Sequence, residues 1–244
     1  MMDPLFIAFL GLLLLFVLIA LHVPIGPAMG LAGVAGFAAL AGLAPALAIP
    51  GAEAVSIFRN LDLGVIPLFL LMGSLASVSG LSDDLYALAR AFLGHRRGGL
   101  AAATIGGSAA FGAVCGSSIA TVATMARVAL PEMVARGTER GFAAGTIAAG
   151  GTLGVVIPPS VLLVIYALLA DQFMLAVFAA AVVPGILAAV MQMLAAAGYA
   201  RLRPQAAPAL ERMSWRERWH AVRQAWAVLL LAFVLTAGLY GGVV

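Results

Sequence analysis

Residues 150–160 read Gly-Gly-Thr-Leu-Gly-Val-Val-Ile-Pro-Pro-Ser, and they interrupt an otherwise apolar segment. Proline lacks a backbone N–H and glycine is a poor helix former, so a continuous helix through this stretch is unfavourable. Irregular backbone at membrane depth is tolerated only where protein or a water-filled cavity surrounds it. We therefore predict a broken transmembrane helix over residues 141–170.

A second interrupted segment precedes the first, at residues 98–135. It is too long for one crossing at a rise of about 1.5 Å per residue. Its middle, residues 112–118, reads Gly-Ala-Val-Cys-Gly-Ser-Ser, which is a poor helix interior. We predict a re-entrant helical hairpin with Cys115 as a small apolar residue at its tip. Ser117 or Ser118 is the expected N-cap of the second arm, because serine is favoured at that position.

The composition of the whole chain is that of a membrane protein. Of its 244 residues, 64% are hydrophobic and 9% are charged, whereas about 25% of the residues in a soluble domain are charged. This excludes a soluble globular domain, a disordered chain and a coiled coil. The length allows about seven or eight crossings of roughly 20 residues. The predicted fold class is an all-α polytopic membrane protein, a helical bundle with a re-entrant hairpin and a broken transmembrane helix.

Further membrane spans are expected on both sides of the interrupted segments. Short amphipathic helices lying in the membrane interface are predicted over 81–92 and 202–222, and residues 50–62 are predicted to lie at a surface. The apolar spans are predicted over residues 4–21, 28–49, 63–80 and 225–244.

All 13 basic residues are arginines, and they fall between the apolar segments. If 98–135 is a hairpin and 141–170 crosses the membrane, every arginine except Arg59 lies on one side. The positive-inside rule places that side in the cytoplasm and the N-terminus outside. The net charge of +3 is therefore interpreted as a topology signal and not as nucleic-acid binding. The arginines of residues 201–223 are expected to contact lipid head groups.

Broken helices expose carbonyl groups at one half-helix end and amide groups at the other. The carbonyl ends, near 114–116 and 151–156, favour a cation such as Na⁺, and the amide ends favour an anionic group. Thr152 can add a hydroxyl oxygen, and Pro158-Pro159 suit the start of the second half-helix. These features leave three interpretations: an ion-coupled transporter, a pore with the hairpin as its filter, and an intramembrane enzyme. The enzyme would need Ser117 or Ser118 as nucleophile, and neither has a histidine or carboxylate near it in the sequence.

Four stretches resemble one known family. They are residues 63–73, 116–121, 148–160 with Ile165-Tyr166, and 184–187. The family is the large membrane subunit, DctM type, of the tripartite ATP-independent periplasmic (TRAP) transporters. Cys115 and residues 167–172 depart from its usual pattern.

The resemblance implies a secondary transporter and not an enzyme. A TRAP permease is expected to import a small organic acid (a C4-dicarboxylate, a sialic acid or a related carboxylate) together with Na⁺ across a bacterial inner membrane. Transport is expected to proceed by an elevator movement of one domain. The implied partners are a periplasmic substrate-binding protein, a small four-helix membrane subunit of the DctQ type and membrane lipid. Apart from Na⁺ as coupling ion, no cofactor or metal is implied.

The resemblance also implies the roles of individual segments and residues. Residues 1–97 resemble the scaffold helices of the family, and residues 98–170 resemble its transport domain. Residues 171–244 are expected to be transmembrane helices joined by an arginine-rich cytoplasmic segment. All three parts are expected to belong to a single membrane domain. The family has two inverted repeats, so we expect the chain to be an N-terminal half; a truncated or split half-subunit without transport of its own is the alternative. The implied Na⁺-binding residues are Gly116, Ser117, Ser118, Thr121, Gly151 and Thr152, and the implied substrate-side residues are Ser118, Pro158, Pro159 and Ser160.

Overall fold

The computed structural model describes residues 4–59 and 61–240, which form helices and contain no β-strand. This part of the chain divides into two compact units, the first ending at Leu63 and the second beginning at Gly64. The predicted all-α fold class is confirmed. Because the two units are separate bodies, each is described by itself.

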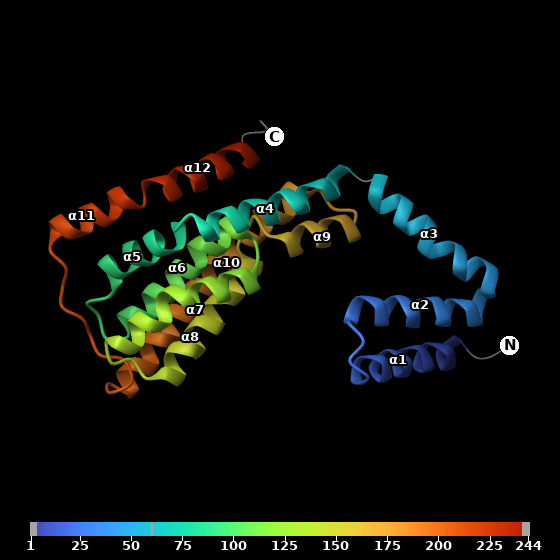
Figure 1. Cartoon of the computed structure of the whole chain (residues 1–244), viewed down its shortest axis with the longest axis horizontal. Coiled ribbons are helices and arrows are strands. Elements are labelled where there is room, and N and C mark those ends of the chain that lie inside the picture. The colour runs from blue at the N-terminus through green and yellow to red at the C-terminus, as the bar shows by residue number, and fades with distance from the viewer. Residues whose placement is uncertain (1–3, 60, 241–244) are drawn as a thin grey trace. The chain divides into compact units, whose positions relative to one another are not determined.

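The first unit contains α1 (Pro4–Ala20), α2 (Ile25–Ala41) and α3 (Leu43–Arg59). Helix α2 packs against both α1 and α3 (Figure 1). Ala28 and Ala46 are fully buried in these contacts, because small side chains let helices approach closely. Large apolar side chains such as Leu5 and Phe16 are exposed, as expected of helices that face lipid.

The prediction of one span over residues 28–49 is wrong. Helix α2 ends at Ala41, because Gly42 adopts φ +92°, a conformation that glycine tolerates far better than other residues. Helix α3 then runs on through residues 50–59, which are exposed as predicted but helical. A short 3-10 turn, η1 (Leu61–Gly64), follows.

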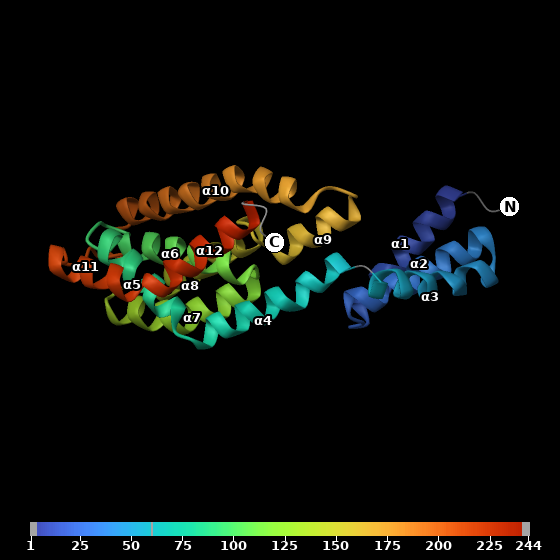
Figure 2. The ribbon, with the colours of Figure 1, turned by 90° about the horizontal axis from the view of Figure 1, so that it is seen from above.

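The second unit is built around α6, which packs against the helices on either side of it in sequence and against α8 and α10 (Figures 1 and 2). Ile105, Phe111 and Val114 of α6 are almost completely buried. The helices of this unit are α4 (Val65–Val78), α5 (Leu81–Leu93), α6 (Gly99–Cys115), α7 (Ser118–Ala135), α8 (Arg140–Val156), α9 (Val161–Leu169), α10 (Met174–Leu202), α11 (Trp215–Gln224) and α12 (Trp226–Tyr240).

Several helices are suited to cross a membrane. Helices α7, of 18 residues, and α10, of 29 residues, are each long and apolar enough. The pairs α4–α5 and α8–α9 reach that length together and are bent by 66° and 42°. The predicted broken helix is thus α8–α9, and the predicted hairpin is α6–α7. The chain is a multi-pass helical membrane protein.

The two predicted amphipathic segments fold differently from each other. Residues 81–92 form α5, whose apolar residues Leu85 and Tyr86 are buried. Residues 202–222 do not form one helix, because Pro204 and Pro208 interrupt the chain before α11 begins at Trp215. The predicted last span is described only as far as Tyr240, and residues 241–244 lie outside the described residues.

Glycine lets the central helices meet backbone to backbone. A Cβ atom placed on Gly112 of α6 would lie 2.6 Å from the Cα atom of Gly154 in α8. A Cβ atom on Gly154 would lie 2.9 Å from the carbonyl oxygen of Ser117. Both distances are shorter than any normal carbon contact, so only glycine fits this crossing.

We expect Gly154→Ala to destabilise the protein by about 1–3 kcal/mol, because the added methyl group overpacks the crossing against rigid backbone. Gly145→Ala is the matched control on the same helix, since nothing lies within 4 Å of its Cβ position. The control should keep or raise stability, because alanine favours a helix by about 1 kcal/mol. Thermal unfolding in detergent checks both variants, and equal melting temperatures would contradict the close crossing.

Candidate ion and substrate site

The tip of the α6–α7 hairpin is a two-residue turn. Gly116 ends α6 in the left-handed conformation, with φ +61°, and its N–H donates to the carbonyl of Gly112 at 2.8 Å. Ser117 is extended and caps α7, its Oγ accepting from the N–H of Ala120 at 3.4 Å. Of the two serines predicted as N-cap, the structure selects Ser117.

Buried side chains hold this turn in place. The hydroxyl of Thr121, which is fully buried, donates to the carbonyl oxygen of Ser117 at 2.8 Å. The Sγ atom of Cys115 lies 3.2 Å from the same hydroxyl. Cys115 is a free, buried thiol, which confirms its prediction as a small residue at the tip.

The break between α8 and α9 leaves backbone carbonyls without helical partners. The last helical bond of α8 runs from the N–H of Ile157 to the carbonyl of Leu153. The next donors in the helical ladder would be residues 158 and 159, but both are prolines and have no N–H. The carbonyls of Gly154 and Val155 therefore receive no such bond.

The prediction that Pro158-Pro159 begin the second half-helix is wrong. Helix α9 begins at Val161, with Ser160 in the extended N-cap position. A residue that precedes proline is pushed away from the helical conformation, so Ile157 and Pro158 are both disfavoured as helix residues. The prolines consequently lie in the break itself.

The two interruptions meet at one place, which we call the junction: residues 115–121 of the hairpin and 154–161 of the broken helix. The N–H of Val161 donates to the carbonyl of Gly116 at 3.3 Å. A Cβ atom on Gly116 would lie 3.0 Å from the carbonyl oxygen of Pro159. Backbone from residues far apart in the sequence is thus in direct contact, beside the close crossing of Gly112 and Gly154.

Four helix ends converge at the junction. The C-terminal ends of α6 and α8 carry partial negative charge, and the N-terminal ends of α7 and α9 carry partial positive charge. In the described residues, no group of three or more His, Cys, Asp or Glu side chains is arranged to hold a metal ion. The polar atoms of the junction are backbone groups, the hydroxyls of serine and threonine and the thiol of Cys115. The oxygen atoms can hold a hard cation, and the amide groups can hold an anion beside it.

The structure brings together most, but not all, of the residues implied by the resemblance. Gly151 faces α7, where Val122 contacts its Cβ position. Thr152 lies on another face of α8: its hydroxyl donates to the carbonyl of Ala149 at 2.7 Å and accepts from Nε2 of Gln192, on α10, at 3.3 Å. The residues at the junction are Gly116, Ser117, Ser118, Thr121, Pro158, Pro159 and Ser160.

Two further residues were not predicted as individual site residues. Gly154, whose carbonyl belongs to the predicted 151–156 end, contacts the hairpin: a Cβ atom on it would lie 2.9 Å from the carbonyl oxygen of Ser117. Ser108 of α6 is buried, and its Oγ lies 2.8 Å from the Cβ position of Gly150. Among the described residues, the buried hydroxyls of Ser108 and Ser160 have no hydrogen-bond partner. The sequence signal that could have identified Ser108 is that it is a single serine within a run of alanine and glycine.

The fold and the junction define a multi-pass helical membrane protein with interrupted helices, a construction found in ion-coupled transporters. The family model described as "Tripartite ATP-independent periplasmic transporter, DctM component" matches residues 12–244. The chain belongs to this family.

Relatives of known description agree with this assignment. The chain is 38% identical, over 78% of its length, to the C4-dicarboxylate TRAP transporter large permease protein DctM of Pseudomonas aeruginosa. It is 35% identical over 99% of its length to the isethionate TRAP transporter permease protein DctMQ of Oleidesulfovibrio alaskensis. It is 31% identical over 76% of its length to the ectoine permease TeaC of Halomonas elongata. The matches cover 44%, 37% and 43% of these relatives, so the chain spans less than half of their lengths.

We expect Thr121→Val to lower the melting temperature and Ser160→Ala to leave it unchanged or raise it. Thr121→Val removes a buried hydrogen bond, which costs about 1 kcal/mol. Ser160→Ala removes a buried hydroxyl that has no partner in the described structure. Thermal unfolding of the two variants in detergent checks the contrast. An equal loss of stability in both would mean that the Ser160 hydroxyl is hydrogen-bonded after all.

Proposed function

We propose that this chain works in a TRAP large permease that imports a small organic acid together with Na⁺ across a bacterial inner membrane. The observation that carries the proposal is the junction, where the hairpin tip and the break of α8–α9 are joined by the hydrogen bond from Val161 to Gly116. The junction offers oxygen atoms for a cation and helix N-termini for an acid in one place. Membership of the DctM family supports the same proposed function.

The proposed Na⁺ site uses oxygen atoms of the hairpin tip and of the break. The hydroxyl of Thr121 donates its proton to Ser117 and lies beside the thiol of Cys115, so one lone pair remains available to a cation. The carbonyls of Gly154 and Val155, which the prolines leave without donors, are further ligands. Neutral oxygen ligands suit a hard monovalent ion that must be released again after each cycle.

The organic acid is proposed to bind at the N-terminal ends of α7 and α9. These ends present free amide groups and a positive partial charge, both of which stabilise a carboxylate. Ser118 begins α7 and is half-exposed, and Ser160 caps α9. Pro158 and Pro159 shape the same side of the junction. Relatives are named for C4-dicarboxylate, isethionate and ectoine, and we propose a carboxylate of this size range for the present chain.

The wider mechanism is proposed on the same family basis. A periplasmic binding protein would deliver the acid, and a small DctQ-type subunit would complete the membrane complex. Residues 98–170, which hold the hairpin and the broken helix, would move as part of the transport domain against scaffold helices within residues 1–97. The distribution of arginines supports a periplasmic N-terminus.

We expect Thr121→Val to raise the Na⁺ concentration that gives half-maximal uptake by about tenfold, since one ligand to the ion is lost. Thr121→Ser keeps the hydroxyl and should remain close to wild type. Thr152→Val is the matched control, because the Thr152 hydroxyl bonds to Ala149 and Gln192 and not to the junction. The measurement is uptake of radiolabelled C4-dicarboxylate by the assembled transporter in proteoliposomes at graded Na⁺ concentrations.

Two results would overturn this proposal. Uptake that is indifferent to Na⁺ would remove the coupling. A shift in Na⁺ dependence with Thr152→Val, together with none in Thr121→Val, would move the ion to the α8–α10 face.

A further inference from the structure

Helix α11 carries a charged residue on the face by which it packs. The buried positions of α11 and the start of α12 are Arg218, Ala221, Ala225 and Val228, a helical spacing that marks one continuous face. Three of the four are apolar, as packing against α5 requires. Arg218 is the exception, and only 8% of its surface is exposed.

The guanidinium of Arg218 lacks a counter-charge in the described part of the chain. It lies over the ring of Phe92, 5.8 Å from the ring centroid, and its buried Nε and Nη2 atoms have no hydrogen-bond partner. The ion pairs found among the described residues both use Glu132, which binds Arg90 and Arg136. An ionised group buried without a partner is strongly unfavourable. An anion from outside the described chain would satisfy it.

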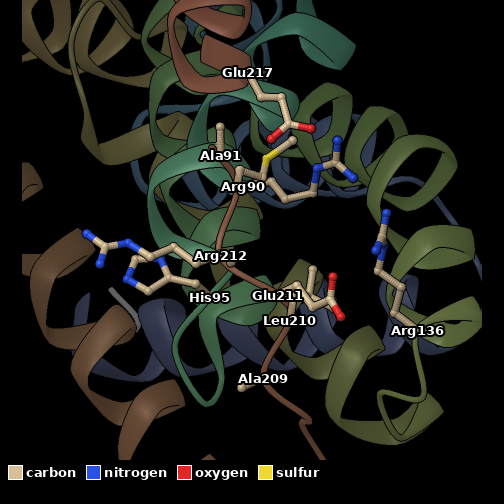
Figure 3. A pocket seen from close by; sticks show the side chains of 11 residues that line it. Arg90, Ala91, His95, Arg136, Ala209, Leu210, Glu211, Arg212 and Glu217 are labelled. Atoms are coloured by element: carbon tan, nitrogen blue, oxygen red, sulfur yellow. The ribbon is translucent and has the colours of Figure 1, made fainter. Parts of the chain in front are cut away.

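Neighbouring groups add positive charge at the same place. Burial and then the charges of Arg218, Arg212 and Arg96 lower the pKa of His95 and so disfavour its charged form, against an opposing hydrogen bond to the backbone of Phe92. His95 and Arg212 lie side by side at one edge of the pocket in Figure 3.

The nearby carboxylates form no ion pair with these arginines in the described part of the chain. Glu217 closes a capping box: its Oε2 accepts from the N–H and the hydroxyl of Ser214, both at 2.7 Å, and these bonds lower its pKa. Glu211 projects toward the opposite side of the pocket from Arg212 (Figure 3). We call Arg96, Arg212, Arg218 and the neighbouring imidazole of His95 the α11 basic cluster; among the described residues, none of these three arginines forms an ion pair.

Tryptophan side chains place this cluster at the membrane surface. Trp215, Trp219 and Trp226 are 73%, 59% and 63% exposed. Their spacing of four and seven residues puts them along one side of α11 and the first turn of α12. Tryptophan concentrates at the head-group level of membranes, and the apolar helix α12 begins at Trp226. An anion available at that depth is a lipid phosphate.

We propose that Arg218, together with His95 and Arg212, binds the phosphate group of an anionic phospholipid. The guanidinium supplies charge-assisted donors to the phosphate oxygens. The tryptophan side chains contact the glycerol and upper acyl region of the same lipid layer. The lipid would fasten α11 to α5, and so hold the start of α12 at a fixed depth.

The chain provides its own probe for a test. All three tryptophans of the sequence lie beside the α11 basic cluster, so intrinsic tryptophan fluorescence reports only on this patch. The full chain in mixed micelles is titrated with brominated phosphatidylglycerol or brominated phosphatidylcholine, whose bromine atoms quench nearby indole rings. We expect brominated phosphatidylglycerol to reach half-quenching at about a tenfold lower mole fraction, since both lipids carry a phosphate but the arginines repel the choline cation of phosphatidylcholine.

Matched variants separate Arg218 from general surface charge. Arg218→Gln should abolish the preference for phosphatidylglycerol, and Arg223→Gln, an exposed residue of the same helix, should leave it intact. Arg212→Gln should reduce the preference with little effect on folding, because Arg212 is also exposed, and it serves if Arg218→Gln does not fold. Competition by inorganic phosphate would support a phosphate-directed site. Equal quenching by both lipids, or phosphate binding with no preference for phosphatidylglycerol, would overturn the assignment.

Discussion

The hydrogen bond from the N–H of Val161 to the carbonyl of Gly116 joins the two interruptions on which the second unit is built. It forms only because the flanking helices approach to backbone contact, and that approach requires glycine at positions 112 and 154. A side chain at either position would hold the hairpin away from the break. The carbonyl and amide groups at the helix ends would then lie in apolar surroundings without polar partners, which is unfavourable at membrane depth. The glycines thus stabilise the site and the core together.

The junction works with partial charges and not with ionised side chains. Helix ends and hydroxyl groups attract Na⁺ or a carboxylate with moderate strength, and their own burial costs far less than that of a charged residue. Under the proposed function this matters, because a transporter must release what it binds. Thr121 is an example: its hydroxyl closes the hairpin turn through Ser117 and keeps one lone pair for an ion.

Ionised groups gather instead at the other end of α6 and α7. Glu132 of α7 binds Arg90 of α5 and Arg136, which ties the base of the hairpin to the preceding helix. Arg218 and its neighbours extend this charged region along α11. The two ends of the hairpin therefore have different chemistry: neutral oxygen atoms at the tip, and ionised arginine and glutamate side chains at the base.

The sequence by itself determined the membrane class, the hairpin, the broken helix and the family. These follow from composition and from local rules, since glycine and paired prolines interrupt helices wherever they occur. It did not determine the turn at Gly42, because a change in the φ angle of a single residue is enough to make that turn. It also did not determine the start of α9, which begins later than predicted because a residue before proline is disfavoured in a helix. Tertiary structure alone decided that Thr121 lies at the junction while Thr152 faces Gln192. It also decided that Arg218 lies on a packed face. Both outcomes depend on which side of a helix meets its neighbour, and that is fixed by the close contact of distant glycines.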